Sequence, residues 1–215
     1  MAYRHLAELR ADWRRSRGEI ERRLEEFRRL RTASDERMLA ELAFCLFAIQ
    51  TSARRSDAAV RELVKSGLLL RGTPGQVARV LRRHVRFHNH KAVYLVAARE
   101  RFEGNPGAFR RQLDALAVAS VAREWLVRDI DGFGYKEASH FLRNIGRGEG
   151  LAILDRHVLR NLRRHGVLRS VPDSLARRRY LEIEEKVQRF ARDVRISMAA
   201  LDLVFWSRET GEVFK

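Results

Sequence analysis

The sequence predicts an all-α protein built from two helical lobes, and three observations lead to this fold class. Apolar residues recur at the three- and four-residue spacing of one helix face along most of the chain. No segment shows the strict alternation of a half-buried strand. Residues that start and stop helices divide the pattern into short segments. A chain of 215 residues is long enough to form two small lobes with a sizeable core.

The first half of the chain carries the clearest helix starts. Ser34 is expected to cap a helix that has acidic residues in its first turn. Residues 73–76, Thr-Pro-Gly-Gln, predict a capping box with proline at the first helical position. Residues 89–103 predict a further helix, which ends at the Gly-Asn-Pro-Gly turn of residues 104–107. The buried stripe of the helix after Ser34 comprises Met38, Leu42, Cys45, Leu46 and Ile49.

In the second half, a helix is expected to start near Ser120, and glycines mark several helix ends. Residues 135–145 and 155–165 predict two helices, each followed by a glycine in the manner of a C-cap. Two long charged segments, residues 177–193 and 197–209, are expected to form the last helices.

The most glycine-rich stretch, residues 146–150, is expected to be the crossing between the two lobes. The central lobe then comprises residues 36–148. Residues 1–35 together with 149–215 form the second lobe. We expect a cleft between these lobes to hold the active site.

The charge of the chain points to a polyanionic partner. Lys and Arg number 44 against 28 Asp and Glu, which gives a formal net charge of +16. Such an excess on a small protein favours nucleic acid first and an anionic membrane surface second. A basic protein without a polyanionic partner stays an alternative at this point.

The apolar segments and the cysteine count narrow the possible classes of protein further. The amino-terminal segment is charged throughout, unlike a signal peptide, and no window approaches eighteen apolar residues, so we expect no membrane span. The cytoplasm, or a nucleoid within it, fits best. Cys45 is the single cysteine, which excludes an intramolecular disulfide and any four-cysteine zinc or iron–sulfur site.

The most informative segment is a turn between two predicted helices, Gly132-Phe133-Gly134. Glycines at i and i+2 allow a sharp turn and a close approach of backbone N–H groups to a large ligand. Phe133 is expected to point back between the helices, and the first N–H groups of the second helix then form an anion site suited to a DNA phosphate. An ordinary αα-hairpin would share this turn.

Lys136 and Asp155 are the candidate catalytic pair. Lys136 lies in the first turn of the second helix, where the helix dipole disfavours a cation and so favours the nucleophilic neutral amine. Asp155 follows 19 residues later (155 − 136), at the head of the next helix, where it could stabilise a developing positive charge. A surface lysine and a simple N-cap are the structural alternatives.

These residues resemble the helix-hairpin-helix DNA glycosylase superfamily. The match covers most of the chain, from about residue 36 to the end. Residues 132–136, Gly-Phe-Gly-Tyr-Lys, look like its hairpin, in which the lysine marks members that combine glycosylase and AP lyase activity. Residues 154–158, Leu-Asp-Arg-His-Val, look like its aspartate segment. Residues 48–52 and 87–92 resemble two further recurrent segments, the first with an amide side chain, here Gln50, that fills the gap left by a flipped base.

Within the superfamily, three segments are similar to the archaeal-type (type 2) 8-oxoguanine DNA glycosylase/AP lyases. They read KEASHFLRNIG, LAILDRHVL and WSRETGEVFK, the last at the carboxyl terminus. This resemblance implies that Phe87 and Trp206 stack on the flipped base and that Lys215 helps to distinguish oxidised guanine. A core position for Trp206 and a frayed terminus for Lys215 are the alternatives.

The expected reaction is excision of 8-oxoguanine from duplex DNA through a lysine Schiff base and β-elimination, by a monomer and without a cofactor. The alternatives are a glycosylase for oxidised pyrimidines and a non-catalytic helix-hairpin-helix DNA-binding module. His84 and His88 have the i, i+4 spacing of a helical zinc pair. No third ligand is evident and the neighbours are basic, so we expect no metal.

Overall fold

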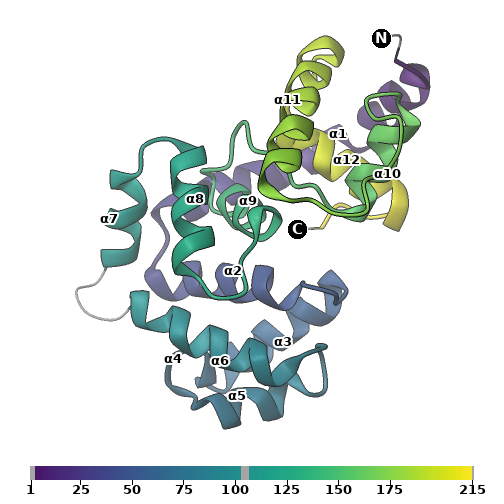
Figure 1. Ribbon diagram of the computed structural model, residues 1–215. Helices are drawn as coiled ribbons and strands as arrows, with labels where there is room; N and C mark the ends of the chain where they lie inside the picture. The colour runs from purple at the N-terminus through teal and green to yellow at the C-terminus, as the bar shows by residue number, and fades with distance from the viewer. Residues whose placement is uncertain (1–2, 103–106, 215) are drawn as a thin grey trace.

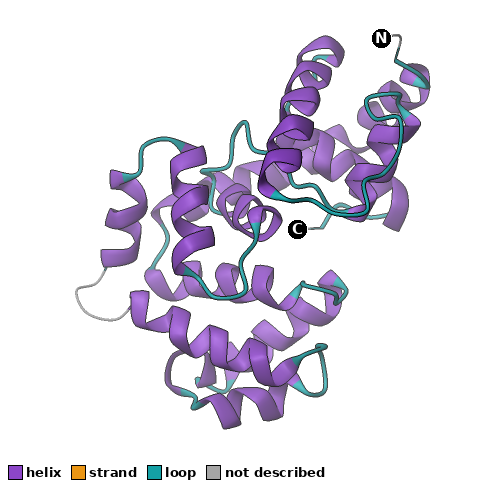
Figure 2. Cartoon of the chain, in the orientation of Figure 1, coloured by secondary structure: helices purple, strands orange, loops and turns teal. Residues whose placement is uncertain are grey.

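The computed structural model describes residues 3–102 and 107–214, which form helices joined by loops (Figure 2). These residues contain no strand, and the predicted all-α class is confirmed. The helices and two short 3-10 segments follow in this order: α1 (Leu6–Arg29), η1 (Leu30–Thr32), α2 (Asp35–Phe47), α3 (Ala53–Lys65), α4 (Leu68–Arg71), α5 (Pro74–Leu81), α6 (His88–Arg99), η2 (Glu100–Phe102), α7 (Ala108–Ala115), α8 (Ala119–Asp129), α9 (Tyr135–Asn144), α10 (Arg156–Arg164), α11 (Arg177–Val194) and α12 (Met198–Thr210).

Local sequence explains most of these boundaries. The Ser34 hydroxyl accepts a hydrogen bond from the Arg37 N–H, and both bonds of the capping box at residues 73–76 form. The helix predicted over residues 89–103 is shorter, because α6 ends at Arg99 and tightens into a 3-10 turn. Of the turn predicted at 104–107, residues 104–106 lie outside the described residues.

Two clusters of buried apolar side chains form the core. One gathers residues of α2 to α9, from Met38 to Leu151. The other combines Leu9, Ile20 and Phe27 of α1 with residues of the carboxyl-terminal segment from Ala152 to Val213. Figure 1 shows the corresponding arrangement, with α2 to α8 gathered in one part and α1, α10, α11 and α12 in the other.

Helix α9 packs between these two clusters. Its residues Ala138 and Phe141 belong to the first, while the Arg143 guanidinium lies 4.7 Å from the Phe27 ring of α1. A buried ion pair holds α8 against α11, with Arg123 Nη1 2.6 Å from Glu184 Oε1 and Nη2 2.8 Å from Oε2. The hairpin between α8 and α9 is therefore fixed relative to both clusters.

Candidate active site at the hairpin

The turn between α8 and α9 packs closely onto α2 and α6. Gly132 has φ +81°, and a Cβ there would lie 2.7 Å from Cδ2 of Tyr94 and 3.0 Å from Cδ1 of Leu46. Only glycine suits both this left-handed backbone and this space. Phe133 is buried, with its ring 6.3 Å from that of Phe141. Gly134 is extended, and its N–H donates to Glu137 Oε2 at 3.3 Å.

The structure thus refines the predicted anion site. Because Glu137 already accepts the Gly134 N–H, that group is engaged within the chain. The N–H groups of the first turn of α9 have no partner within the helix, and they are the donors a phosphate would meet.

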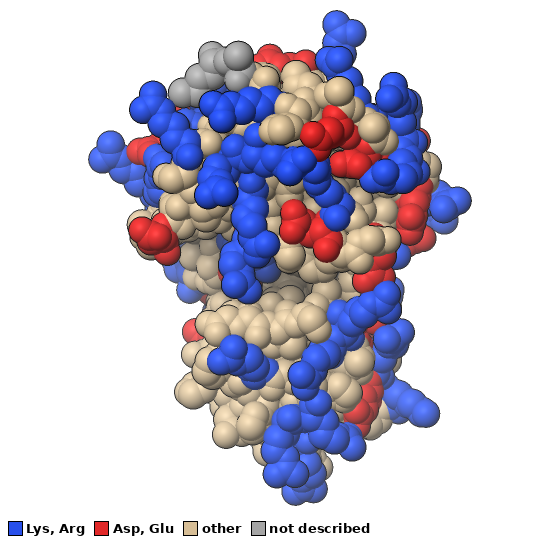
Figure 3. Space-filling model, turned by 90° about the vertical axis from the view of Figure 1, so that its right-hand side faces the viewer, with Lys and Arg blue, Asp and Glu red and all other residues tan. Residues whose placement is uncertain are grey.

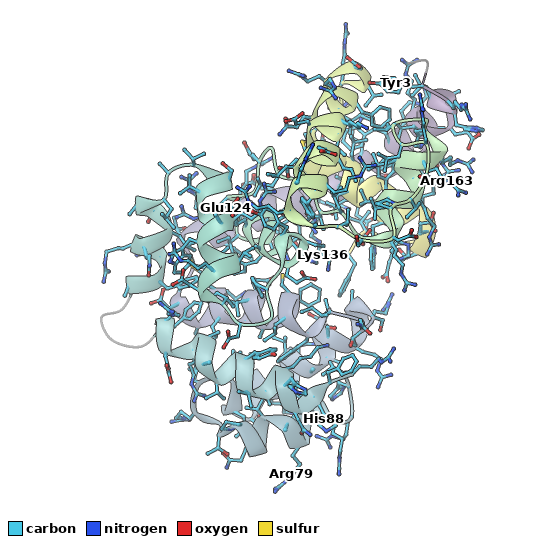
Figure 4. All side chains as sticks on the ribbon, viewed as in Figure 1. Tyr3, Arg79, His88, Glu124, Lys136 and Arg163 are labelled. Carbon is cyan, nitrogen blue, oxygen red and sulfur yellow. The ribbon has the colours of Figure 1, made fainter. Side chains whose placement is uncertain are left out.

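Lys136 is a partly buried lysine in that first turn, with 22% of its side chain exposed. Its Nζ lies 3.7 Å from Glu137 Oε1. Its positive charge acts on both parts of the molecule: it adds to the fall that burial causes in the pKa of Lys91 on α6, and it opposes the rise that burial causes in the pKa of Asp202 on α12. Figure 4 shows Lys136 between the part that contains α10 to α12 and the part that contains α2 to α6.

Asp155 is the N-cap of α10, where Oδ1 accepts the Val158 N–H at 2.8 Å. Its charge also acts on Asp202, whose pKa it raises while Lys136 lowers it. The charges of Lys136 and Asp155 thus act on the same carboxyl group, although the two residues belong to different elements of the chain.

Asp202 is a third charged residue of the candidate site, beside Lys136 and Asp155, and the sequence did not predict it. Its side chain is 12% exposed, and its Oδ2 lies 3.3 Å from Nη2 of Arg143. Burial raises the pKa of Asp202 to about 6; Asp155 adds to this rise, and Arg143 and Lys136 oppose it. The available signal was one acidic residue inside the otherwise apolar run of residues 198–206.

The predicted base-contacting residues lie on several elements. Gln50 is exposed in the turn after α2 and has φ +52°. Phe87, at the start of α6, has φ +56° and is 51% exposed. Trp206 packs edge-on against His157 with 5.1 Å between ring centroids, and its indole nitrogen has no hydrogen-bond partner within the described residues. Lys215 lies outside the described residues.

A basic surface surrounds a hollow in the molecule. Figure 3 shows this hollow between the upper and lower parts, with Lys and Arg side chains along its borders. Asp and Glu are fewer on this face. The electrostatic requirement for a DNA backbone is met here.

The zinc pair considered at His84 and His88 is not on one helix. His84 follows the end of α5 and its Nε2 lies 2.8 Å from Glu62 Oε2, whereas His88 opens α6. Within residues 3–102 and 107–214, no group of three or more His, Cys, Asp or Glu side chains could hold a metal ion. Over the same residues, no helix combines the length and apolar character needed to cross a membrane.

A two-part helical fold, a glycine hairpin that opens a helix with a lysine, and an aspartate at the head of the next helix define the helix-hairpin-helix class of DNA glycosylase folds. The family model described as 8-oxoguanine DNA glycosylase matches residues 20–196. The chain belongs to this family.

Individual relatives agree with this assignment. The 8-oxoguanine DNA glycosylase/AP lyase of Fusobacterium nucleatum is 39% identical over 195 residues, 90% of this chain and 89% of its own length. The crystal structure of the 8-oxoguanine DNA glycosylase of Thermotoga maritima superposes with a TM-score of 0.88 at 34% identity, covering 98% of both chains. The Methanocaldococcus jannaschii 8-oxoguanine glycosylase/lyase, in complex with 15mer DNA containing 8-oxoguanine, gives 0.81 at 34% identity over 93% of both chains.

Proposed function

We propose that this protein is a bifunctional 8-oxoguanine DNA glycosylase/AP lyase. The observation that carries the proposal is Lys136, a lysine in the first turn of the hairpin helix with only 22% of its side chain exposed. The family membership indicates which damaged base is the substrate, namely 8-oxoguanine. The names of the relatives match it, and one of them is seen with DNA that contains 8-oxoguanine.

The proposed reaction begins with nucleophilic attack. The Lys136 ammonium first loses a proton to solvent, and the resulting amine attacks C1′ of the flipped nucleotide; the glycosidic bond breaks, and the base leaves with its bonding electrons and gains a proton. The amine gives up its protons as the sugar opens to an imine. Loss of a proton from C2′ then expels the 3′ phosphate and nicks the strand. Asp155 stabilises the positive charge that develops on the sugar.

The remaining residues hold the substrate. The hairpin, Gly132 to Gly134 with buried Phe133, docks one phosphate at the start of α9. Gln50 fills the space left by the flipped base. Phe87 and Trp206 stack on that base, and Lys215 reads its oxidised edge. No step uses a cofactor or a metal.

We propose that the chain divides into two lobes, residues 36–148 against 1–35 plus 149–215, and that the reacting sugar lies between them. We propose a monomer, because one chain supplies every residue named for the reaction. Since the substrate is duplex DNA, we place the protein with the nucleoid in the cytoplasm.

A trapping experiment tests the nucleophile. Wild-type protein, Lys136→Gln and the control Lys186→Gln are incubated with 8-oxoguanine duplexes and borohydride, which reduces the imine to a stable adduct. We expect adducts with the wild type and the control, and none with Lys136→Gln, which should still bind the duplex. An adduct at wild-type level with Lys136→Gln refutes the assignment.

A comparison of lesions tests the substrate. Strand cleavage is measured on duplexes that contain 8-oxoguanine, thymine glycol or an abasic site. Preference for thymine glycol would make the protein a glycosylase for oxidised pyrimidines. Salt-sensitive binding with no cleavage of any duplex would make it a non-catalytic DNA-binding module.

A further inference from the structure

Lys91 is a lysine buried within the part of the molecule that contains α2 to α9, with 3% of its surface exposed. Its Nζ lies 2.8 Å from the Phe47 carbonyl oxygen, 2.6 Å from that of Ile49 and 3.3 Å from Thr51 Oγ1. A buried ammonium is costly unless its protons are accepted, and here three oxygens accept them. Lys91 is thus a satisfied internal cation and not a surface charge.

All three acceptors belong to the end of α2 and the turn that follows it. The last carbonyls of a helix have no partner within the helix and form the negative end of its dipole, so an ammonium suits them. Gln50 lies between two of the residues that Lys91 contacts, and it has φ +52°. A residue other than glycine adopts this left-handed conformation only where its surroundings hold it there.

A second turn of the same kind lies beside the first. Phe87 has φ +56° at the start of α6, and its carbonyl accepts the Lys91 backbone N–H at 3.1 Å. The N–H of Arg86 donates to Thr51 Oγ1 at 3.3 Å. We call residues 48–51 and 86–87 the paired turns. Lys91 touches one with its ammonium and the other with its backbone.

We propose that Lys91 is a positioning residue that holds the paired turns together, so that Gln50 and Phe87 are presented to DNA in a fixed arrangement. This inference rests on the roles proposed above for Gln50 and Phe87. Loss of the ammonium leaves the carbonyls of α2 without their donor. The backbone around Gln50 is then free to return to a right-handed conformation, which moves its amide away from the vacated space.

The electrostatics of the site show that burial of this ammonium carries a penalty. Burial lowers the pKa of Lys91 to about 8, and the charges of Arg86 and Lys136 contribute. An apolar side chain of similar volume carries no such penalty, which points to the contacts that the cation makes.

The test separates base flipping from strand cleavage. In Lys91→Met, single-turnover excision of 8-oxoguanine should fall about tenfold to a hundredfold, the value of hydrogen bonds to a charged group. Cleavage of a duplex with a preformed abasic site should hardly change, because no base has to be extruded and stacked. Lys65→Met, which replaces an exposed lysine of α3, serves as the matched control.

Two further measurements exclude a merely structural effect. Gln50→Ala should slow excision in the wild type but add little in Lys91→Met, because both changes remove the same action. A 2-aminopurine beside the lesion should brighten when wild-type protein opens the stack, and less so with Lys91→Met. Additive losses, or equal losses of excision and abasic-site cleavage, would overturn the proposal.

A milder variant covers the case in which Lys91→Met does not fold. Thr51→Val removes the hydroxyl shared by Lys91 and Arg86, and it should show the same selective loss with the same coupling to Gln50. Wild-type protein that neither excises 8-oxoguanine nor forms a trapped adduct refutes the proposed function instead. An active wild type with uncoupled variants refutes only the role of Lys91.

Discussion

Arg54 of α3 and Glu212, which follows α12, form a two-point ion pair across 158 residues of sequence. Arg54 Nε lies 2.9 Å from Glu212 Oε1, and Nη2 lies 2.5 Å from Oε2. The next residue, Val213, is buried with the second cluster, whereas Phe214 packs against the first, its ring 6.4 Å from that of Phe44. The carboxyl-terminal tail therefore joins the two parts of the molecule beside the proposed site.

Breaking this ion pair should weaken excision selectively. An exposed pair contributes about 1 kcal/mol or less, so Arg54→Met should slow 8-oxoguanine excision a few-fold. Cleavage of an abasic site should not change, since no base is present for the tail to hold. The exchange Arg54→Glu with Glu212→Arg should restore excision. Equal loss of both activities would show that the tail does not act on the base.

Replacing Asp155 separates its two roles. Asparagine is as good an N-cap as aspartate, so Asp155→Asn should keep the Val158 contact and the stability of the fold. Excision should nevertheless fall about a hundredfold or more, because a charge that stabilises the transition state is lost. Urea denaturation and single-turnover kinetics measure the two effects. In Asp155→Ala we expect the same kinetic loss and, in addition, about 1 kcal/mol of destabilisation.

The sequence predicted the parts of the site that have local signatures. The glycine hairpin, its lysine and the capping aspartate follow one another within a short segment, and each has a recognised place in a helix or turn. The helix starts at Ser34 and Thr73 were predictable for the same reason: a side chain bonds a backbone group three residues away.

The features of the site that the sequence did not predict depend on packing between distant segments. Asp202 joins the candidate site only because α12 places it beside Arg143 of α9. The sequence does not distinguish Lys91 from the other lysines of a basic chain, because its contacts are with the carbonyl groups at the distant end of α2. The i, i+4 spacing of His84 and His88 does not place them on one helix, because the chain between them is a turn, which no helical spacing rule anticipates.

The two hairpin glycines should respond differently to alanine. Gly132→Ala should cost about 1–3 kcal/mol of unfolding free energy, because φ is +81° and the new methyl group would overlap Tyr94. Gly134 is extended, and a Cβ there meets only the Glu137 carboxylate, at 3.2 Å. Gly134→Ala should therefore fold normally.

The DNA affinity of the Gly134→Ala variant then tests the phosphate contact proposed at the hairpin. If the hairpin docks a phosphate, Gly134→Ala should bind duplex DNA more weakly, with a slope of log K against log salt smaller by roughly 1. Fluorescence titrations at several salt concentrations measure this slope. An unchanged slope with unchanged affinity would remove Gly134 from the interface.

His165 should make the protein less stable in weak acid. The imidazole is fully buried between Phe190 and Phe205, and Nδ1 lies 2.9 Å from the Arg4 carbonyl oxygen, to which it must donate. Nε2 has no partner within the described residues, so protonation would place an unpaired N–H there.

Burial, aided by Arg208 and Arg164, accordingly lowers the pKa of His165 below its usual 6.5, although the bond to Arg4 opposes the shift. The unfolded chain then binds a proton at a higher pH than the folded one. The stabilising contribution of the neutral ring is complete above about pH 6.5 and is lost as the pH falls from there towards the folded pKa.

Urea midpoints at pH 7.5 and 5 should differ less in His165→Phe than in the wild type. The control His90→Phe, at an exposed position of α6, should keep the wild-type difference. The same pH dependence in all three proteins would mean that His165 already ionises in the folded state as it does in the unfolded chain.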